Sequence, residues 1–137
     1  MLPQIMKPLN WLIVIVVLLN FSGCTREDGS RKGSGTLSIY AILGDSKAYH
    51  GQLVLVTGFF QFQQEAIGLF PSAETARYGD FASGVWVYLD GIEAVSLDGQ
   101  WVVIHGVFSA SDRGHGGAYA GSLRSVNIFP AGPPLYE

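Results

Sequence analysis

Two segments of this chain nearly repeat each other at an offset of 48 residues, and both have the composition of β-strands. Residues 51–60 read GQLVLVTGFF, and residues 99–108 read GQWVVIHGVF. Each begins with a turn glycine and continues through β-branched and other apolar residues, which favour strands. Each also reaches a second glycine, Gly58 or Gly106, where a strand can coil sharply. The shared pattern predicts two strands with equivalent places in one closed sheet.

Side chains alternate between the two faces of a strand, so Val54 and Val56 fall on one face and Leu53 and Leu55 on the other. Both faces of this segment are apolar, and the second segment shows the same property. Strands of this kind occur where the outer face is also covered. We therefore expect a helix or a loop to cover the outer face of both segments.

The remaining elements are short and separated by glycine-rich turns. Strands are predicted at residues 66–70, 84–89 and 118–129, the last with a bulge. Residues 71–77 predict a helical turn with Ser72 as N-cap, and residues 90–91 a tight turn. Residues 37–42 fit either a strand or a helix, and residues 44–50 a turn or one helical turn. Five or six short strands favour an all-β small barrel with minor helix over a sandwich.

The N-terminal residues have the marks of an export signal. Lys7 precedes an apolar run at residues 11–19, and the sequence FSGC follows at residues 21–24. The run has nine residues, whereas a helix that crosses a bilayer needs about 20. These residues resemble a bacterial lipoprotein signal, although Phe21 stands where the lipobox usually has leucine. An uncleaved N-terminal anchor, or a plain signal followed by a coincidental cysteine, are the alternatives.

The resemblance implies that residues 1–23 are a signal peptide and that Cys24, the only cysteine, becomes the lipidated N-terminus. Acyl chains such as palmitate at one cysteine would attach the protein firmly to a membrane. By analogy with the sorting of Gram-negative lipoproteins, Thr25 implies delivery to the outer membrane, facing the periplasm. The expected localisation is therefore the cell envelope, as a lipid-anchored protein.

Two further regions follow Cys24. Residues 24–35 are charged and rich in glycine and serine, which predicts a flexible linker. Residues 36–137 predict one domain that folds without disulfides and relies on an apolar core. This domain has nine acidic residues against four basic ones, Lys47, Arg77, Arg113 and Arg124. Its balance of −5 is unfavourable for contact with phosphate backbones, so no nucleic-acid partner is expected.

Two motifs carry a resemblance to a known fold. Residues 49–58 (YHGQLVLVTG) resemble the Y-x-G-x-x-V-x-V-x-G opening of small bacterial OB-like barrels, and residues 114–121 (GHGGAYAG) resemble a G-H-x-G-x-x-x-G segment of an uncharacterised group of them. The similarity covers residues 36–129 and implies an OB-like barrel of five to six strands. That fold usually has its main helix between the third and fourth strands, whereas the better helical candidate here comes earlier. A fold of this kind does not by itself define an activity.

The candidate ligand site is the loop at residues 112–119, where polar side chains gather in a glycine-rich stretch between the last two strands. The mouth of a small barrel commonly holds ligands. The candidate residues are Asp112, Arg113, His115 and Tyr119. A purely structural turn is the other interpretation, because glycine-rich hairpin loops need no function.

Catalytic and metal-binding signatures are weak. His50, His105 and His115 have a spacing that matches no metal motif, and no serine lies in a G-x-S-x-G or S-x-x-K setting. No cofactor, metal site or catalytic residue is predicted. The runner-up hypothesis is a small metal-assisted enzyme that uses His105 and His115.

The sequence thus predicts a membrane-anchored envelope lipoprotein that acts by binding, with no enzymatic activity. The expected partners are the membrane, through the anchor, and an envelope protein or a glycan or peptide fragment at the 112–119 loop. The chain also holds more large aromatic residues than a small core obviously needs, and some of these could form a stacking platform. They are Phe59, Phe60, Phe62, Phe70, Phe81, Trp86, Tyr88 and Trp101.

Overall fold

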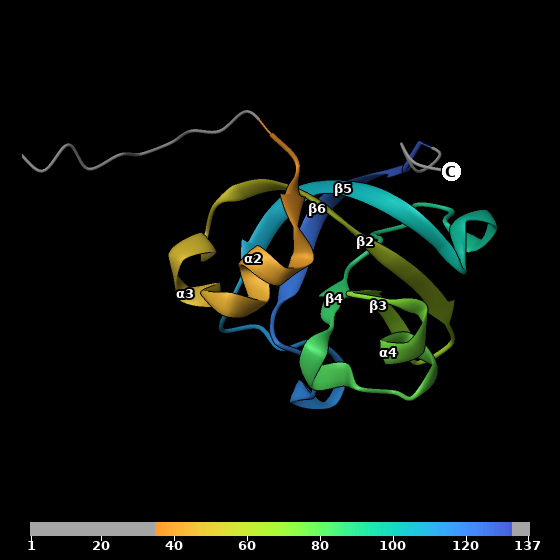
Figure 1. Ribbon diagram of the computed structural model, residues 1–137, viewed down its shortest axis with the longest axis horizontal. Helices are drawn as coiled ribbons and strands as arrows, with labels where there is room; N and C mark the ends of the chain where they lie inside the picture. The colour runs from red at the N-terminus through yellow and green to blue at the C-terminus, as the bar shows by residue number, and fades with distance from the viewer. Residues whose placement is uncertain (1–34, 133–137) are drawn as a thin grey trace, which may run out of the picture. The chain divides into compact units, whose positions relative to one another are not determined.

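The computed structural model describes residues 35–132, apart from the side chain of Ser125, and its core is a five-stranded barrel (Figure 1). The barrel strands are β2 (Leu53–Gln63), β3 (Ala66–Phe70), β4 (Val85–Val87), β5 (Gln100–Ser109) and β6 (Ser122–Pro130). They pair in the order β2-β3-β4-β6-β5, and β5 pairs with β2 to close the ring. Within the barrel only β4 and β6 are parallel. The predicted class, an all-β OB-like small barrel with minor helix, is confirmed.

The lipoprotein signal, Cys24 and the linker up to residue 34 lie outside the described residues. The predictions made for them therefore stay predictions.

The two repeated segments are the central pair of the barrel. β2 and β5 run antiparallel, with Leu53 opposite Val107 at one end and Phe60 opposite Gln100 at the other. β2 then continues past β5 to pair with β3 up to Gln63. One strand therefore belongs to both halves of the sheet, as a closed barrel requires.

Gly58 and Gly106 lie where a side chain would collide with the neighbouring strand. A Cβ atom on Gly58 would lie 2.7 Å from Leu69 Cγ, and one on Gly106 would lie 2.9 Å from Val126 Cγ1. The β5–β6 register shifts beside Gly106, so the predicted bulge in the last strand is confirmed. Both glycines remove the side chain that would hold the sheet open.

Residues 37–42 form both of the elements that their sequence allowed. A short strand, β1 (Leu37–Ser38), pairs in parallel with β2, and α2 (Ile39–Gly44) follows directly. The Ser38 hydroxyl accepts a hydrogen bond from the Tyr40 N–H at 3.3 Å, which caps this helix. α3 (Ser46–Tyr49) is the expected single helical turn. Ile39 and Ile42 are buried in the barrel core, so α2 packs over one end of the barrel.

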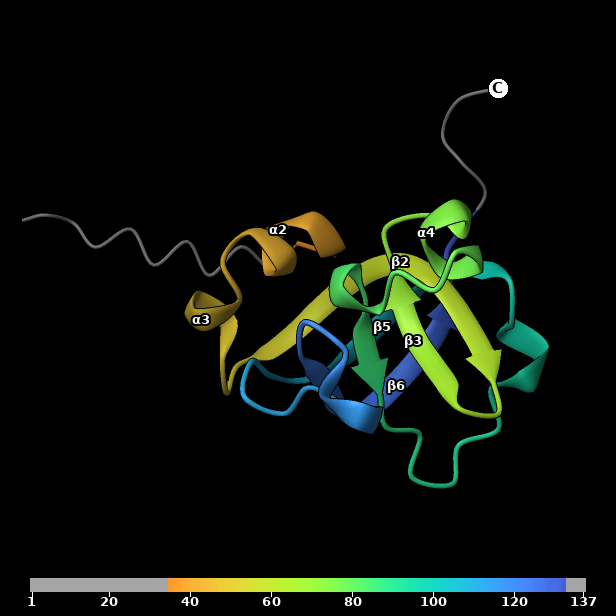
Figure 2. The same ribbon diagram turned by 90° about the horizontal axis from the view of Figure 1, so that it is seen from below.

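α4 (Ala73–Arg77) and the 3₁₀ turn η1 (Phe81–Ser83) connect β3 to β4, the second and third barrel strands. The Ser72 hydroxyl accepts from the Thr75 N–H at 3.1 Å, so the predicted N-cap is confirmed. The β4–β5 connection contains only η2 (Val95–Leu97) and the expected turn, where Asp90 and Gly91 have positive φ. The helix therefore precedes its usual place in the fold. Figure 2 shows α4 beside β2 and β3.

Three details differ from expectation. The outer face of β2 and β5 is not covered within the described residues: Leu53 is 62% and Trp101 49% exposed. The helices pack over one end of the barrel and beside β2 and β3, so they leave β5 open. β4 is shorter than predicted, and β6 begins at Ser122 instead of residue 118. Residues 118–121 lie between the 3₁₀ turn η3 (His115–Gly117) and β6 and form bends, with Tyr119 buried in a second core instead of in the sheet.

Candidate functional site

The 112–119 loop connects β5 to β6, as the sequence predicted, and Asp112 organises its first turn. The Asp112 carboxylate accepts hydrogen bonds from Arg124 Nη2 at 2.7 Å, the Gly114 N–H at 3.1 Å and the Tyr88 hydroxyl at 3.3 Å. Burial alone would raise the pKa of Asp112, but these three donors outweigh it and lower the pKa below its usual value. Asp112 is therefore an ionised anchor for the loop at neutral pH.

Arg124 and Tyr88 complete this anchor. The Arg124 guanidinium lies 3.8 Å from the centre of the Tyr88 ring, in the geometry of a cation–π contact. The hydrogen bond to Asp112 raises the pKa of Arg124, and burial together with the nearby Asp112 charge raises the pKa of Tyr88. The three side chains favour one arrangement, with Asp112 and Arg124 charged and Tyr88 neutral.

Arg113 and Tyr119 hold the two ends of the loop together. Arg113 Nε donates to the Tyr119 carbonyl at 2.7 Å, and the Tyr119 N–H donates to the Arg113 carbonyl at 3.1 Å. The Tyr119 side chain is 1% exposed, and burial raises its pKa to about 12. Its hydroxyl and Trp86 Nε1 are both buried without a hydrogen-bond partner.

Tyr119 belongs to an aromatic cluster on the outer side of the sheet. Its ring lies 5.2 Å from those of Phe81 and Trp86 and 6.2 Å from that of Phe70, measured between ring centres. Ala76 of α4 and Phe59 pack into the same cluster. α4, η1 and the 112–119 loop thus contribute to a second, smaller core on this side of the barrel.

The predicted aromatic platform is therefore mostly internal. OB folds commonly bind ligands on the face of their second and third strands, which are β3 and β4 here. In this chain Phe70 and Trp86 occupy that face and pack under the chain's own loops. Phe60 is likewise fully buried, in the barrel core. Phe59 and Trp101 contact each other edge to face, with ring centres 6.2 Å apart, at the border of the aromatic cluster around Tyr119. Trp101 is half exposed.

The four predicted ligand residues therefore have unequal surroundings. Asp112, Arg113 and Tyr119 make the internal contacts described above, which support the structural interpretation of the loop. His115 is exposed and stacks on Trp86 at 6.0 Å with an interplanar angle of 29°. The structure brings the four together in one loop, and binding there stays a prediction.

The three histidines are placed separately. His50 Nδ1 accepts a hydrogen bond from the Ala110 N–H at 3.0 Å. His105 lies between Leu55 and Asn127 on the β2–β5–β6 sheet, whereas His115 stacks on Trp86, which pairs with Ser122. Asn127 and Ser122 are five residues apart on β6, or roughly 16 Å. Residues 35–132 contain no cluster of three potential metal ligands.

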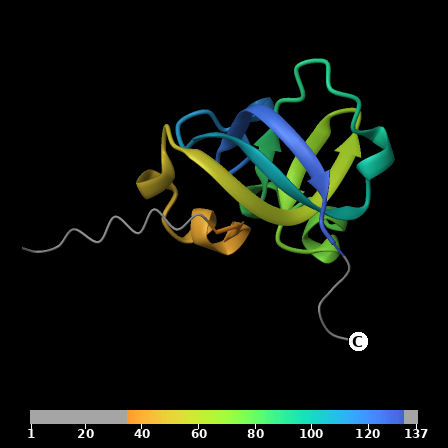
Figure 3. The same ribbon diagram turned by 90° about the horizontal axis from the view of Figure 1, so that it is seen from above.

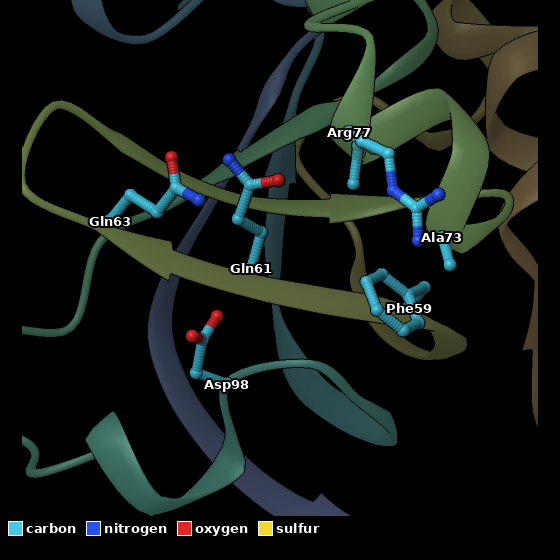
Figure 4. A pocket seen from close by; sticks show the side chains of 7 residues that line it. Phe59, Gln61, Gln63, Ala73, Arg77 and Asp98 are labelled. Atoms are coloured by element: carbon cyan, nitrogen blue, oxygen red, sulfur yellow. The ribbon is translucent and has the colours of Figure 1, made fainter.

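A groove of about 220 Å³ lies beside β2 and α4. Its lining combines an aromatic ring, two small apolar side chains, two carboxamides and one side chain of each charge: Phe59, Ala73, Ala76, Gln61, Gln63, Arg77 and Asp98. Figure 4 shows Phe59, Ala73 and Arg77 together at one end, with Gln63 and Asp98 toward the other. Asp98 Oδ1 accepts from the Phe62 N–H at 2.7 Å, which fixes this carboxylate at the groove.

Gln61 is the most enclosed polar side chain of the groove, with 8% of it exposed. Sequence reasoning missed this site. The alternation of Phe59, Gln61 and Gln63 indicates one face of a strand. Nothing in the sequence indicates that Arg77 and Asp98, from two other segments, lie beside that face.

Comparisons of the chain with protein-family models, curated proteins and solved structures found no match. Among the helices of residues 35–132, none has the length and apolar character to cross a membrane.

Proposed function

We propose that this protein is an exported lipoprotein in which acylated Cys24 tethers an OB-like binding module to a membrane of the cell envelope. The N-terminal sequence supports the tether. The groove beside β2 and α4 is the observation that carries the binding role, because it joins an aromatic surface to several hydrogen-bonding groups without a nucleophile and base in contact. The module acts by non-covalent binding.

The chemistry of the groove favours a neutral ligand. Arg77 and Asp98 contribute opposite charges, and Gln61 and Gln63 each offer both a donor and an acceptor. Vicinal hydroxyl groups need such paired donors and acceptors, and Phe59 offers a ring for the apolar side of a sugar. The volume is below the roughly 300–1,000 Å³ of pockets for drug-sized ligands, so one sugar ring fits better than a long segment.

An extended peptide is a weaker candidate. Peptides that bind by backbone pairing need an exposed strand edge. At the groove, β2 pairs with β3 from Phe59 to Gln63, and the Phe62 N–H on the other edge donates to Asp98, so the groove offers little unpaired strand edge. We therefore propose a glycan fragment of the envelope as the ligand. The acidic surface of the domain disfavours nucleic acid.

The tether is tested by mass spectrometry of the expressed full chain. We expect cleavage before Cys24, an added mass for acyl chains and sedimentation with envelopes. Cys24→Ser removes the thiol and should abolish the added mass. An unchanged mass shift and unchanged sedimentation in that variant would contradict the proposal.

The groove is tested by NMR titration with a neutral oligosaccharide, the tetramer of N-acetylglucosamine. We expect amide shifts at Phe59, Gln61 and Gln63. Binding should weaken at least about tenfold in Arg77→Ala, which loses a hydrogen bond to a charged group, and about two- to tenfold in Gln63→Ala, which loses a neutral one. Lys47→Ala, on α3, and Gln64→Ala, in the β2–β3 turn, are matched controls. Amide shifts confined to the 112–119 loop would indicate that the ligand binds at His115 instead of in the groove. Filter binding of an oligonucleotide at low salt would contradict the assignment of a glycan as the ligand.

A further inference from the structure

A second surface of the barrel, which meets the 112–119 loop only at Arg124, is unusually apolar for the outside of an acidic domain. It consists of the outward side chains of β2, β5 and β6, which run side by side in Figure 3. We call it the apolar face, and it is formed by Leu53, Leu55, Thr57, Phe59, Trp101, Val103, His105, Val107, Arg124, Asn127 and Phe129.

The strand register places these side chains on one side of the sheet. Leu53 lies opposite Val107, which lies opposite Arg124. Two rows further along, Thr57 lies opposite Val103, which lies opposite Phe129. The row between them consists of Leu55, His105 and Asn127, so the exposed apolar side chains lie in two groups on one face, Leu53 with Val107 and Trp101 with Phe129.

Four side chains contribute most of its exposed apolar area. Leu53 and Trp101 are joined by Phe129, which is 55% exposed, and Val107, which is 38% exposed. Together they expose roughly 400 Å², which is as large as the largest apolar patch of a typical monomer, and such patches mark interaction sites.

Charge distinguishes the face from the rest of the domain. The domain holds nine of the chain's 11 acidic residues, but the apolar face has no Asp or Glu. Its one formally charged side chain is Arg124, at its edge, in an ion pair with Asp112. A membrane surface repels carboxylates and accommodates Trp, Phe and Arg at the boundary between headgroups and acyl chains.

The chain outside the structure would hold the domain within reach of a bilayer. Eleven residues separate Cys24 from Thr36. A glycine- and serine-rich chain of that length spans roughly 18 Å on average, compared with a radius of gyration of about 13 Å for a 100-residue domain. Thr36 directly precedes β1, which pairs with β2, so the linker joins the domain beside the apolar face and can hold that face near a membrane in which Cys24 is anchored.

We propose that the apolar face rests on the lipid surface to which the chain is tethered, with Trp101 and Phe129 at the level of the headgroups. This inference rests on the proposed membrane anchor. A second copy of the chain is the alternative occupant; it would make burial of this face depend on protein concentration, whereas a tethered lipid surface would not. The groove beside α4 adjoins this face, because Gln61 and Gln63 follow Phe59 on the same side of β2.

The test uses the full chain with Cys24→Ser, which frees the sequence of native cysteine. Single cysteines are introduced by Phe129→Cys or Leu53→Cys on the apolar face, and by Tyr78→Cys as the control. Tyr78 is 83% exposed at the end of α4, outside the face. Each carries a nitrobenzoxadiazole label, whose emission rises in an apolar environment, and is mixed with vesicles of phosphatidylethanolamine and phosphatidylcholine. The apolar run at residues 11–19 keeps the unacylated chain near the vesicles.

We expect the emission of both face labels to rise at least about threefold on vesicles, as the label leaves water, with no rise at Tyr78. Lipids with a nitroxide group should quench the face labels. The rise should change by less than about twofold between about 0.05 and 0.5 M salt, because apolar burial is not screened. Trp101→Ser should reduce the rise in emission of the face labels, since this substitution removes an aromatic anchor of the face.

Three results would overturn the inference: no rise at either face label, an equal rise at all three labels, or a rise that depends on protein concentration and resists the nitroxide lipids. The last of these assigns the face to a second copy. The mass of the wild-type chain separates this inference from the proposed anchor. If Cys24 is acylated but the emission of the face labels does not change, only the proposed lipid contact is wrong. If the face labels enter the membrane but Cys24 is not acylated, only the proposed anchor is wrong.

Discussion

Gly114 lies directly against Trp86: a Cβ atom on Gly114 would be 2.4 Å from Trp86 Cβ, and its φ is +67°. A side chain there is opposed both by this contact and by the left-handed backbone. We expect Gly114→Ala to lower the free energy of unfolding by about 3 kcal/mol, measured by chemical denaturation. Gly116→Ala is the matched control, because Gly116 has φ +66° but nothing within 4 Å. A loss of about 1 kcal/mol is expected there, and equal losses in both variants would contradict the contact with Trp86.

The Tyr119 hydroxyl is buried without a partner, so its removal should not destabilise the protein. We expect Tyr119→Phe to raise the free energy of unfolding by up to about 1 kcal/mol, because the desolvated hydroxyl disappears and the ring packing stays. Tyr119→Ala should lower it by about 4 kcal/mol through the cavity that it leaves. A loss of stability in Tyr119→Phe would show that the hydroxyl has a partner after all.

Alkaline pH should weaken the fold through the same tyrosine. Burial raises the pKa of Tyr119 from 10.0 to about 12, so the folded chain keeps its proton where the unfolded chain loses it. The contribution of protonated Tyr119 to the free energy of unfolding is fully present below pH 10. It is lost between pH 10 and 12, which lowers the free energy of unfolding by roughly 2–3 kcal/mol. Urea denaturation at a series of pH values measures this loss. Tyr119→Phe should reduce the loss markedly, while Tyr88, whose pKa burial also raises, retains a part of it.

Acid pH tests the anchor of the 112–119 loop. The hydrogen bonds to Asp112 lower its pKa below 3.8, so its contribution is present above pH 3.8 and is lost as the pH falls through the folded value. Asp112→Asn should lower Tm by roughly 5 °C at pH 7, because it removes charge-assisted hydrogen bonds. The difference in Tm between Asp112→Asn and the wild type should become smaller below pH 3.8. Asp80→Asn is the control, because Asp80 is exposed and its side chain does not cap η1.

The strands with strong local patterns were predictable. The repeated glycines around residues 51–60 and 99–108 specified β2 and β5, and Ser72 specified the start of α4, because turns and caps are local properties. β4 and the start of β6 were less predictable. Their bounds depend on where Tyr119 packs, and that packing requires contacts with Phe70 and Phe81 that are distant in sequence.

The candidate sites also differ in how far the sequence predicts them, for the same reason. The 112–119 loop was found because its polar residues are consecutive, but sequence spacing does not reveal that Asp112 pairs with Arg124 or that Tyr119 points into a core. The groove was missed because Gln61, Arg77 and Asp98 come from three separate segments. The exposure of Leu53 and Trp101 was also missed, since an apolar outer face looks the same in sequence whether or not another element covers it.

The pairing of the two repeats has a consequence for how the chain folds. Leu53 lies opposite Val107, so the barrel closes through a contact between residues 54 positions apart. Because contacts between distant residues form slowly, we expect a chain that emerges N-terminus first to stay without its central strand pair until residues 100–107 are available. Folding is then a late and cooperative event, and the first half of the domain by itself has nothing with which to complete its sheet.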